Sequence, residues 1–67
     1  MKILCNGMPV ALEEPCSLYS LMAEKGLLEK KGIAAAVNNT VIPKNEWDQF
    51  ILHDDDNVLL ITAVQGG

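Results

Sequence analysis

Aromatic residues are scarce in this chain, and the motifs that mark most enzyme classes are missing. Only three of the 67 residues are aromatic, so the core must be built from Leu, Ile, Val, Ala and Met, which is ordinary for a compact globular fold. The sequence contains no phosphate-binding loop, dinucleotide fingerprint, CxxC, HExxH or internal repeat. A domain of this length buries only about 60% of the surface of its unfolded chain. We therefore expect no enclosed active site.

Basic residues are also few. Five Lys and Arg residues stand against nine Asp and Glu residues, which gives a net charge of −4, and the longest basic run is Lys30-Lys31. A cluster this short cannot neutralise a phosphate backbone, so nucleic acid is not an expected partner. The acidic balance suits either a basic docking surface on a partner or a surface charge that keeps the protein in solution.

Long hydrophobic segments are absent as well. A membrane-spanning helix needs roughly 20 consecutive apolar residues, and the sequence has no run of that length. The chain begins directly with a strand-like segment, Met1 to Leu4, and not with an export signal. We expect a cytoplasmic protein with no membrane partner.

The two cysteines, Cys5 and Cys16, are not expected to form a disulfide. If Asn6-Gly7 begins a hairpin, Cys16 lies about 20 Å along the returning strand from the position that faces Cys5, at roughly 3.3 Å per residue. A disulfide tolerates only about 7 Å between Cα atoms. The sequence predicts two reduced, mostly structural thiols.

The acidic segment Asp54-Asp55-Asp56 and the single histidine, His53, are weak candidates for a metal or catalytic site. An EF-hand calcium loop needs alternating ligands, a central glycine and a distant Glu, and three adjacent Asp residues do not supply that pattern. His53 has no Cys or Ser at a motif spacing, so we expect a solvated loop residue. We predict no metal site and no bound cofactor.

The chain opens with a predicted β-hairpin. Lys2–Cys5 is typical of a strand, and Asn6-Gly7 is a strong signal for a tight hairpin turn because both residues tolerate positive φ. A second strand, Met8–Leu12, should return antiparallel to the first. Pro9 has no backbone N–H for a ladder, so this second strand should lie at a sheet edge.

A short helix is predicted over Leu18–Lys25. Ser17 can cap its N-terminus, and Leu18, Leu21 and Met22 follow the spacing of a buried helical face. Gly26 stands where a left-handed residue ends a helix, with Leu27 placed to fold back against Met22. The following segment, 27–32, is expected to be irregular.

The second half of the chain predicts two short strands and one helical turn. Ile33–Val37 suits either a helix or a strand by propensity, and we interpret it as a strand. A turn at Asn38-Asn39 then leads to a short returning strand, Thr40–Ile42, which Pro43 stops. In Lys44–Phe50 the aromatic residues Trp47 and Phe50 are spaced for a single helical turn packed on the core.

The last strand and the residues after it organise the rest of the chain. Val58–Ile61 has no polar alternation, which is typical of a central strand covered on both faces. Residues 64–67, Val64-Gln65-Gly66-Gly67, are predicted to be a flexible tail, and at roughly 3.3–3.6 Å each they can reach about 13–14 Å. A carboxylate on Gly67 is ionised at neutral pH and is a poor acyl electrophile until it is activated. This arrangement indicates ATP-dependent activation of Gly67 by another protein.

The predicted order of strands and helix is compatible with an α+β, ubiquitin-like β-grasp fold, with a mixed sheet of about five strands on one main helix. The sequence resembles the ThiS family, the sulfur carriers of the thiamine pathway. The resemblance covers residues 1–67 as a single domain and rests on the Asn6-Gly7 hairpin, the segment from Val37 through Ile42-Pro43 to Trp47, the acidic turn, and the Gly-Gly end. Asp55 departs from the family pattern, which usually has glycine within this turn.

The resemblance implies a carrier that is not itself an enzyme. Gly67 would be adenylated by a ubiquitin-activating-like enzyme that uses ATP and Mg, and then converted to a thiocarboxylate. Thiazole synthase would take that sulfur for the thiazole ring of thiamine. Gly66 would give backbone clearance, and Val64 and Gln65 would guide the tail into the partner. Apolar residues near the last strand, among them Ile61, Ala63 and Val64, are candidates either for a docking surface or for the core.

Three alternatives stay open at the level of sequence. The small subunit of molybdopterin synthase resembles the same fold and also ends in Gly-Gly, although that family tends to be longer. A ubiquitin-like protein modifier would need the same tail. A β-grasp binding module that is not a carrier would make no use of the tail.

Overall fold

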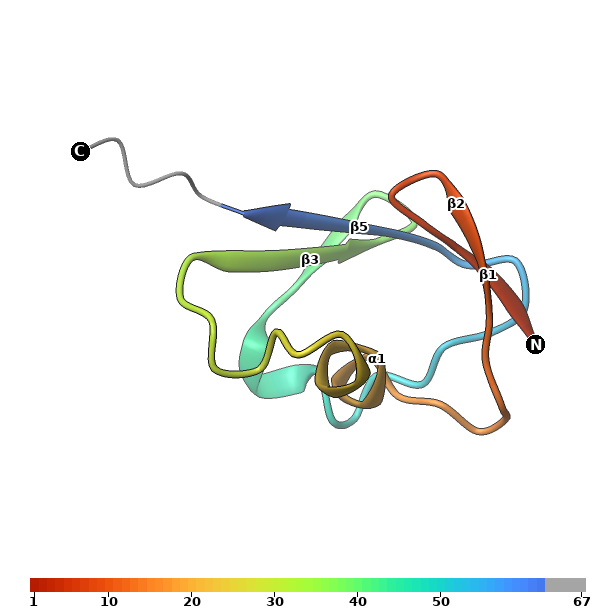
Figure 1. The fold of residues 1–67 in the computed structure, drawn as a ribbon, viewed down its shortest axis with the longest axis horizontal. Helices are drawn as coiled ribbons and strands as arrows, with labels where there is room; N and C mark the ends of the chain where they lie inside the picture. The colour runs from red at the N-terminus through yellow and green to blue at the C-terminus, as the bar shows by residue number, and fades with distance from the viewer. Residues whose placement is uncertain (63–67) are drawn as a thin grey trace.

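A computed structural model describes residues 1–62 of the chain. It contains a mixed five-stranded sheet in the order β2-β1-β5-β3-β4, with α1 packed against one face (Figure 1). This is the β-grasp arrangement expected from the sequence. The elements are β1 (Lys2–Cys5), β2 (Met8–Ala11), α1 (Leu18–Glu24), β3 (Ile33–Val37), β4 (Thr40–Ile42), the 3-10 helix η1 (Lys44–Glu46) and β5 (Asn57–Thr62).

The predicted hairpin is confirmed. Asn6 and Gly7 have φ of 52° and 81°, the positive values that a tight turn between antiparallel strands requires. β2 is an edge strand, as the position of Pro9 predicted. It ends at Ala11, one residue earlier than expected, and the next residue, Leu12, is buried in the core.

The helix begins at the predicted residue and ends one residue before the predicted one. The Ser17 hydroxyl oxygen accepts a hydrogen bond from the backbone N–H of Ser20 at 3.0 Å. Gly26 has φ of 72°, and the N–H of Leu27 donates to the carbonyl of Met22 at 2.9 Å, which is the bond of a Schellman motif. The last helical residue is Glu24, not Lys25, which serves as the cap.

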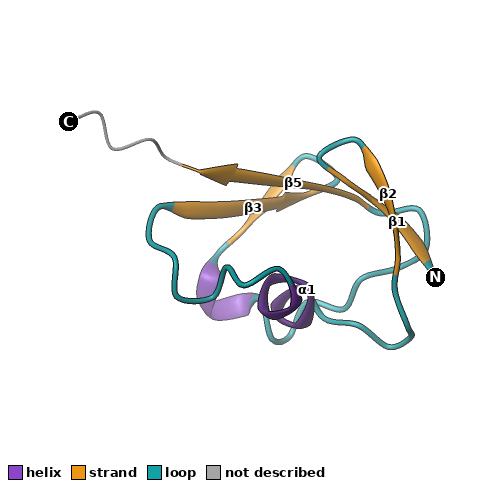
Figure 2. Cartoon of the chain, viewed as in Figure 1, coloured by secondary structure: helices purple, strands orange, loops and turns teal. Residues whose placement is uncertain are grey.

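The strand interpretation of β3 is confirmed, and so is the turn after it. Asn38 and Asn39 adopt φ of 50° and 71°, and β4 then pairs antiparallel with β3. The helical turn is shorter than predicted, since η1 covers only Lys44–Glu46. Figure 2 shows η1 in purple, between the end of β4 and the layer that holds α1.

Trp47 anchors the connection between β4 and β5. Its side chain is 1% exposed, and its indole N–H donates to the carbonyl of Ile42 at 2.9 Å. The chain then runs past the N-terminus of α1, where the Trp47 carbonyl accepts from the N–H of Tyr19 and the Phe50 carbonyl accepts from the N–H of Leu18. These bonds satisfy two of the N–H groups that a helix leaves free at its start.

The position of β5 was predicted correctly, but the burial of its two faces was not. β5 lies between β1 and β3, parallel to the first and antiparallel to the second. Val58 is fully buried, whereas Leu59 and Ile61 are 42% and 51% exposed. Only one face of the sheet is covered by α1 and the core, so the apolar residues of β5 on the other face remain in contact with solvent.

Cys5 and Cys16 are both free and buried, as predicted. His53 is exposed in the loop before β5, which also agrees with the sequence. The longest helix within residues 1–62, α1, has seven residues, and none there is long and apolar enough to cross a membrane.

Candidate functional site

The residues to which the sequence assigns the chemistry, Val64, Gln65, Gly66 and Gly67, lie outside the part of the chain that the structure describes. What the structure defines is the strand that leads to them, β5, which ends at Thr62. The described part of the candidate site therefore consists of β5, the residues that hold this strand in place, and the surface around it.

Two asparagine side chains hold β5 in its place between its neighbours. The side-chain oxygen of Asn38 accepts from the backbone N–H of Asn57 at 3.0 Å, where the strand begins. The side-chain oxygen of Asn6, in the hairpin turn, accepts from the backbone N–H of Leu60 at 2.8 Å. Both asparagines adopt positive φ, which asparagine tolerates better than most residues. The same turn residues therefore shape the backbone and secure β5.

The acidic turn before β5 is a structural element whose carboxylates bind backbone and amide groups. Buried Asp56 accepts from the backbone N–H of His53 at 2.8 Å and from the side-chain amide of Asn38 at 3.0 Å. Asp54 accepts from the backbone N–H of Lys2 at 2.8 Å. Asp55 has φ of 69°, the left-handed conformation that glycine adopts most readily and that Asp tolerates better than most residues. Among residues 1–62 no group of three or more His, Cys, Asp and Glu side chains is arranged to hold a metal ion.

Apolar side chains gather on the sheet face that points away from α1. We call Leu4, Val41, Leu59 and Ile61 the outer face, and their exposed fractions are 41%, 63%, 42% and 51%. Paired residues in a sheet present their side chains on the same face, and Ala36 pairs with both Leu59 and Val41. Leu4 of β1 pairs with Asn57, which is two positions before Leu59 and so lies on the same face of β5. The outer face therefore crosses β1, β5, β3 and β4 as one apolar surface, with Ala36 of β3 between Leu59 and Val41.

Sequence reasoning identified this surface only in part. It named Ile61 as a candidate for docking or core, and the structure places Ile61 on the outer face. Ala63 and Val64, named with it, lie outside the described residues. Leu4, Val41 and Leu59 were missed. Each of the three is directly next to a buried residue of its own strand, so the alternation of faces along a strand was the available signal. An apolar run, however, does not indicate which face of the sheet is uncovered.

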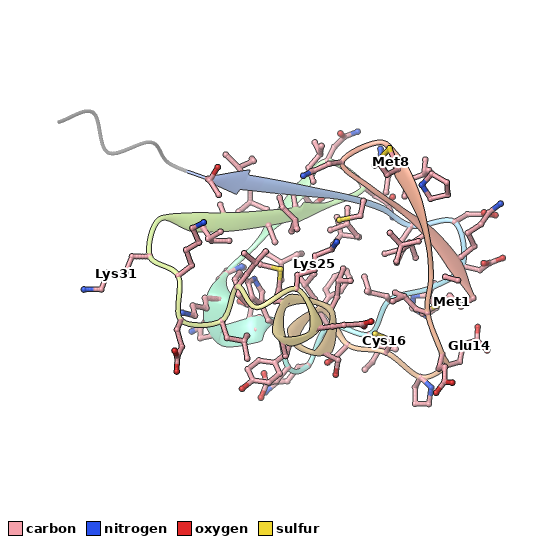
Figure 3. All side chains as sticks on the ribbon, viewed as in Figure 1. Met1, Met8, Glu14, Cys16, Lys25 and Lys31 are labelled. Carbon is pink, nitrogen blue, oxygen red and sulfur yellow. The ribbon has the colours of Figure 1, made fainter. Side chains whose placement is uncertain are left out.

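An open depression of about 340 Å³ lies beside the connection between β2 and α1. Figure 3 places Lys31, just before β3, at one end of the molecule, Glu14 toward the opposite end, and Cys16 between Glu14 and the helix. Thr62 pairs with Ile33 at the start of β3, so β5 ends far from this depression. The residues that line it are Ala11, Leu12, Glu13, Pro15, Cys16 and Glu24.

The thiol in this depression is not prepared for nucleophilic chemistry. Burial raises the pKa of Cys16, and the negative charge of Glu24 raises it further. A thiol must be ionised to act as a nucleophile or a metal ligand, so Cys16 is a poor one at neutral pH. Among the described residues, the outer face and the end of β5 are therefore the candidate functional surface.

Comparison with known proteins gives consistent results. The model of the ThiS family matches residues 7–67. The sulfur carrier protein ThiS of Escherichia coli K12 is 28% identical over 67 residues, which is 100% of both chains. An uncharacterized protein of Porphyra purpurea, ycf40, is 33% identical over 67 residues, covering 100% of this chain and 93% of that protein.

Two solved structures, both of a thiamine biosynthesis protein from Geobacter metallireducens, share the fold. The crystal structure superposes with a TM-score of 0.84 at 20% identity and covers 100% of both chains. The solution structure gives a TM-score of 0.79 at 20% identity and covers 100% of this chain and 88% of that one. The five-stranded β-grasp architecture is therefore the same in these proteins.

Proposed function

The chain belongs to the ThiS family, and from this we propose that it is a sulfur carrier for thiamine biosynthesis whose sulfur is bound at Gly67. A partner enzyme adenylates the Gly67 carboxylate with ATP and Mg, the adenylate becomes a thiocarboxylate, and thiazole synthase takes the sulfur. The carrier is a co-substrate of these enzymes and not a catalyst. It works in the cytoplasm, and the free thiols of Cys5 and Cys16 support a reducing compartment.

The chemistry requires only a carboxylate from this chain. An oxygen of the Gly67 carboxylate attacks the α-phosphorus of ATP, pyrophosphate leaves, and an acyl adenylate forms. A sulfur nucleophile at the oxidation level of hydrosulfide then attacks the acyl carbon, AMP leaves with the bonding electron pair, and the thiocarboxylate remains. Activation by adenylation is needed because a carboxylate is a poor acyl electrophile.

The observation that carries the proposal is the family match, which runs without interruption to Gly67. Gly66 and Gly67 have no side chains, so a narrow partner channel can admit them. β5 supports this assignment because it leads directly from the centre of the sheet to these residues. Val64 and Gln65 would contact the channel entrance and guide the tail.

Intact mass spectrometry tests this function directly. The protein is incubated with ATP, magnesium, a sulfur source and its cognate adenylating enzyme. We expect the mass of the carrier to change by the exchange of one oxygen for one sulfur, and tandem spectra to place the change on Gly67. An isopeptide bond between Gly67 and a lysine of another protein would instead indicate a protein modifier. Capture by a molybdopterin synthase large subunit, and not by thiazole synthase, would indicate the sibling pathway.

The outer face supplies the second requirement of the proposal, a docking surface apart from the tail. Ordering four tail residues costs about 1–2 kcal/mol each, so contacts elsewhere must offset several kcal/mol. Leu59 and Ile61 lie nearest to the tail on β5, and their exposed apolar surface is suited to burial against a partner. We propose that the adenylating enzyme and thiazole synthase both dock on the outer face.

We predict that replacing Leu59 or Ile61 with Ser weakens binding of the adenylating enzyme at least about tenfold, or about 1.4 kcal/mol. Both side chains are about half exposed, so the melting temperature should change little. Isothermal titration and thermal unfolding measure the two effects. The matched control is Tyr19→Ser, which removes an exposed aromatic residue from α1, on the other side of the sheet. If the Tyr19 variant lost as much affinity as the Leu59 variant, the outer face would not be the docking surface.

A further inference from the structure

β5 extends well beyond the strand that pairs with it on one side. β1 is in register with β5 only at Leu4↔Asn57 and Cys5↔Val58, and it then turns away at Asn6. On its other side β5 is paired with β3 as far as Thr62. The last part of β5 therefore has a partner strand on one side only, within the described residues.

The direction of each peptide group along β5 follows from the hydrogen bonds. The carbonyls of Asp56 and Val58 accept from the N–H groups of Leu4 and Asn6, at 2.9 Å each, so these residues face β1. The carbonyl of Asn57 accepts from the N–H of Asn38 and faces β3. Peptide groups of successive strand residues point to opposite sides. Even-numbered residues of β5 therefore face the side of β1.

Because of this alternation, peptide groups at the end of β5 face the side where β1 no longer pairs with the strand. The N–H of Leu60 faces the side of β1 and is satisfied by the side chain of Asn6, which ends the pairing. The next even residue is Thr62, so its N–H and C=O point in the same direction, as does the C=O of Leu60. β1 has no residue opposite them. Leu60 and Thr62 thus offer one backbone donor and two backbone acceptors on the side that β1 has left.

We propose that the adenylating enzyme adds an extended segment to this open edge, paired with Leu60 and Thr62. Addition of a strand to an open sheet edge is a common mode of protein recognition, with backbone bonds giving affinity and alternate side chains giving specificity. The residue of the added strand opposite Ile61 shares the outer face, so it should be apolar and pack against Ile61. This inference rests on the proposed function and specifies how the partner holds the carrier.

The position of the open edge favours an enzyme segment as the occupant. It adjoins the outer face through Leu59 and Ile61, so one partner can cover both. It also lies immediately before residues 63–67, so a strand bound there fixes the direction in which the chain leaves the domain. The two outermost strands are less suitable, since β2 contains Pro9 and β4 has only three residues.

Amide hydrogen exchange followed by NMR gives the direct test. In the free protein the N–H of Ile61, which faces β3, should exchange slowly, and the N–H of Thr62 should exchange much faster. On binding the cognate adenylating enzyme with ATP and magnesium, we expect protection of the Thr62 amide to rise at least about tenfold. Wild-type carrier that is loaded with sulfur while the Thr62 amide gains no protection would overturn the added strand and leave the proposed function intact. Absence of sulfur loading in the wild type would overturn both.

A substitution provides the second test. Thr62→Pro removes the N–H that faces the open edge, and the N–H is not part of the β3 ladder, so the fold should persist. We expect binding of the adenylating enzyme to weaken at least about tenfold, or about 1.4 kcal/mol. Thr62→Val keeps the N–H and changes only the side chain, and it should bind like the wild type. Equal affinity of the proline and valine variants, with both folded by circular dichroism, would contradict the proposal.

Discussion

Deletion of Gly67 is expected to abolish sulfur loading and to leave the folded domain unchanged. The deletion moves the carboxylate back along the chain by about 3.3–3.6 Å. Misplacing a reacting group by about 1 Å can cost about a hundredfold in rate, so loading should fall below about one hundredth of the wild-type rate. Intact mass spectrometry after incubation with the adenylating enzyme, ATP, magnesium and a sulfur source measures the loss. Thermal unfolding should give the same melting temperature for both proteins.

A bulky residue at Gly66 should have nearly the same effect for a different reason. Gly66→Val keeps the length of the chain and the Gly67 carboxylate, but it adds a side chain where the proposed channel requires none. Gln65→Ala shortens a side chain that the channel already accommodates, and it should retain most of the loading rate. Full loading of the Gly67 deletion would show that the end of the chain is not the reacting group. Equal losses in the Gly66→Val and Gln65→Ala variants would show that the channel does not require a residue without a side chain at position 66.

Local sequence signals predicted most of the fold because each has a local physical cause. Asn6-Gly7 specifies its turn through the φ values that these residues tolerate, and Gly26 ends α1 for the same reason. The edge position of β2 follows from the missing N–H of Pro9. Such signals depend on a few neighbouring residues, and the rest of the chain need not be known.

Properties that depend on distant pairing could not be predicted in this way. The apolar run Val58–Ile61 was interpreted as covered on both faces, and the structure shows that wrong, since Leu59 and Ile61 are exposed. The residue type alone does not tell whether an apolar side chain packs in the core of the domain or is exposed for a partner. The bond from the Leu60 N–H to Asn6, across 54 positions of sequence, is likewise a property of the assembled sheet. The features that the sequence did not predict are therefore those that define the outer face and the open edge of β5.

β5 can hold its end, Thr62, in a fixed place only if the small core that packs against the strand is stable. The buried residue with the largest side chain is Trp47, on the connection that leads from β4 to β5. Its ring is surrounded by the core cluster, its N–H is bonded to Ile42, and its carbonyl caps α1 through Tyr19. One residue thus links the helix, the edge of the sheet and the approach to β5.

Trp47→Ala is expected to lower the melting temperature of the domain by roughly 12–40 °C. Replacing a buried Trp with Ala costs about 3–5 kcal/mol through lost burial and the cavity left behind. At about 0.05–0.15 kcal/mol per residue, the whole domain has roughly 3–10 kcal/mol of stability, so the loss takes a large part of it. Each kcal/mol shifts the melting temperature of a domain this small by about 4–8 °C. Circular dichroism melting measures the change and does not depend on the fluorescence of the residue removed.

Two further variants separate the contributions of the ring. Trp47→Phe keeps most of the apolar contact and removes the N–H, which leaves the Ile42 carbonyl without this donor, so it should cost about 1–3 kcal/mol. Tyr19→Ala, on the exposed side of α1, should cost less than about 1 kcal/mol, because its ring is about half exposed. If the Ala variant at position 47 melted within a few degrees of wild type, Trp47 would not anchor the core. The stability of the domain that holds β5 would then have to come from α1 and the sheet alone.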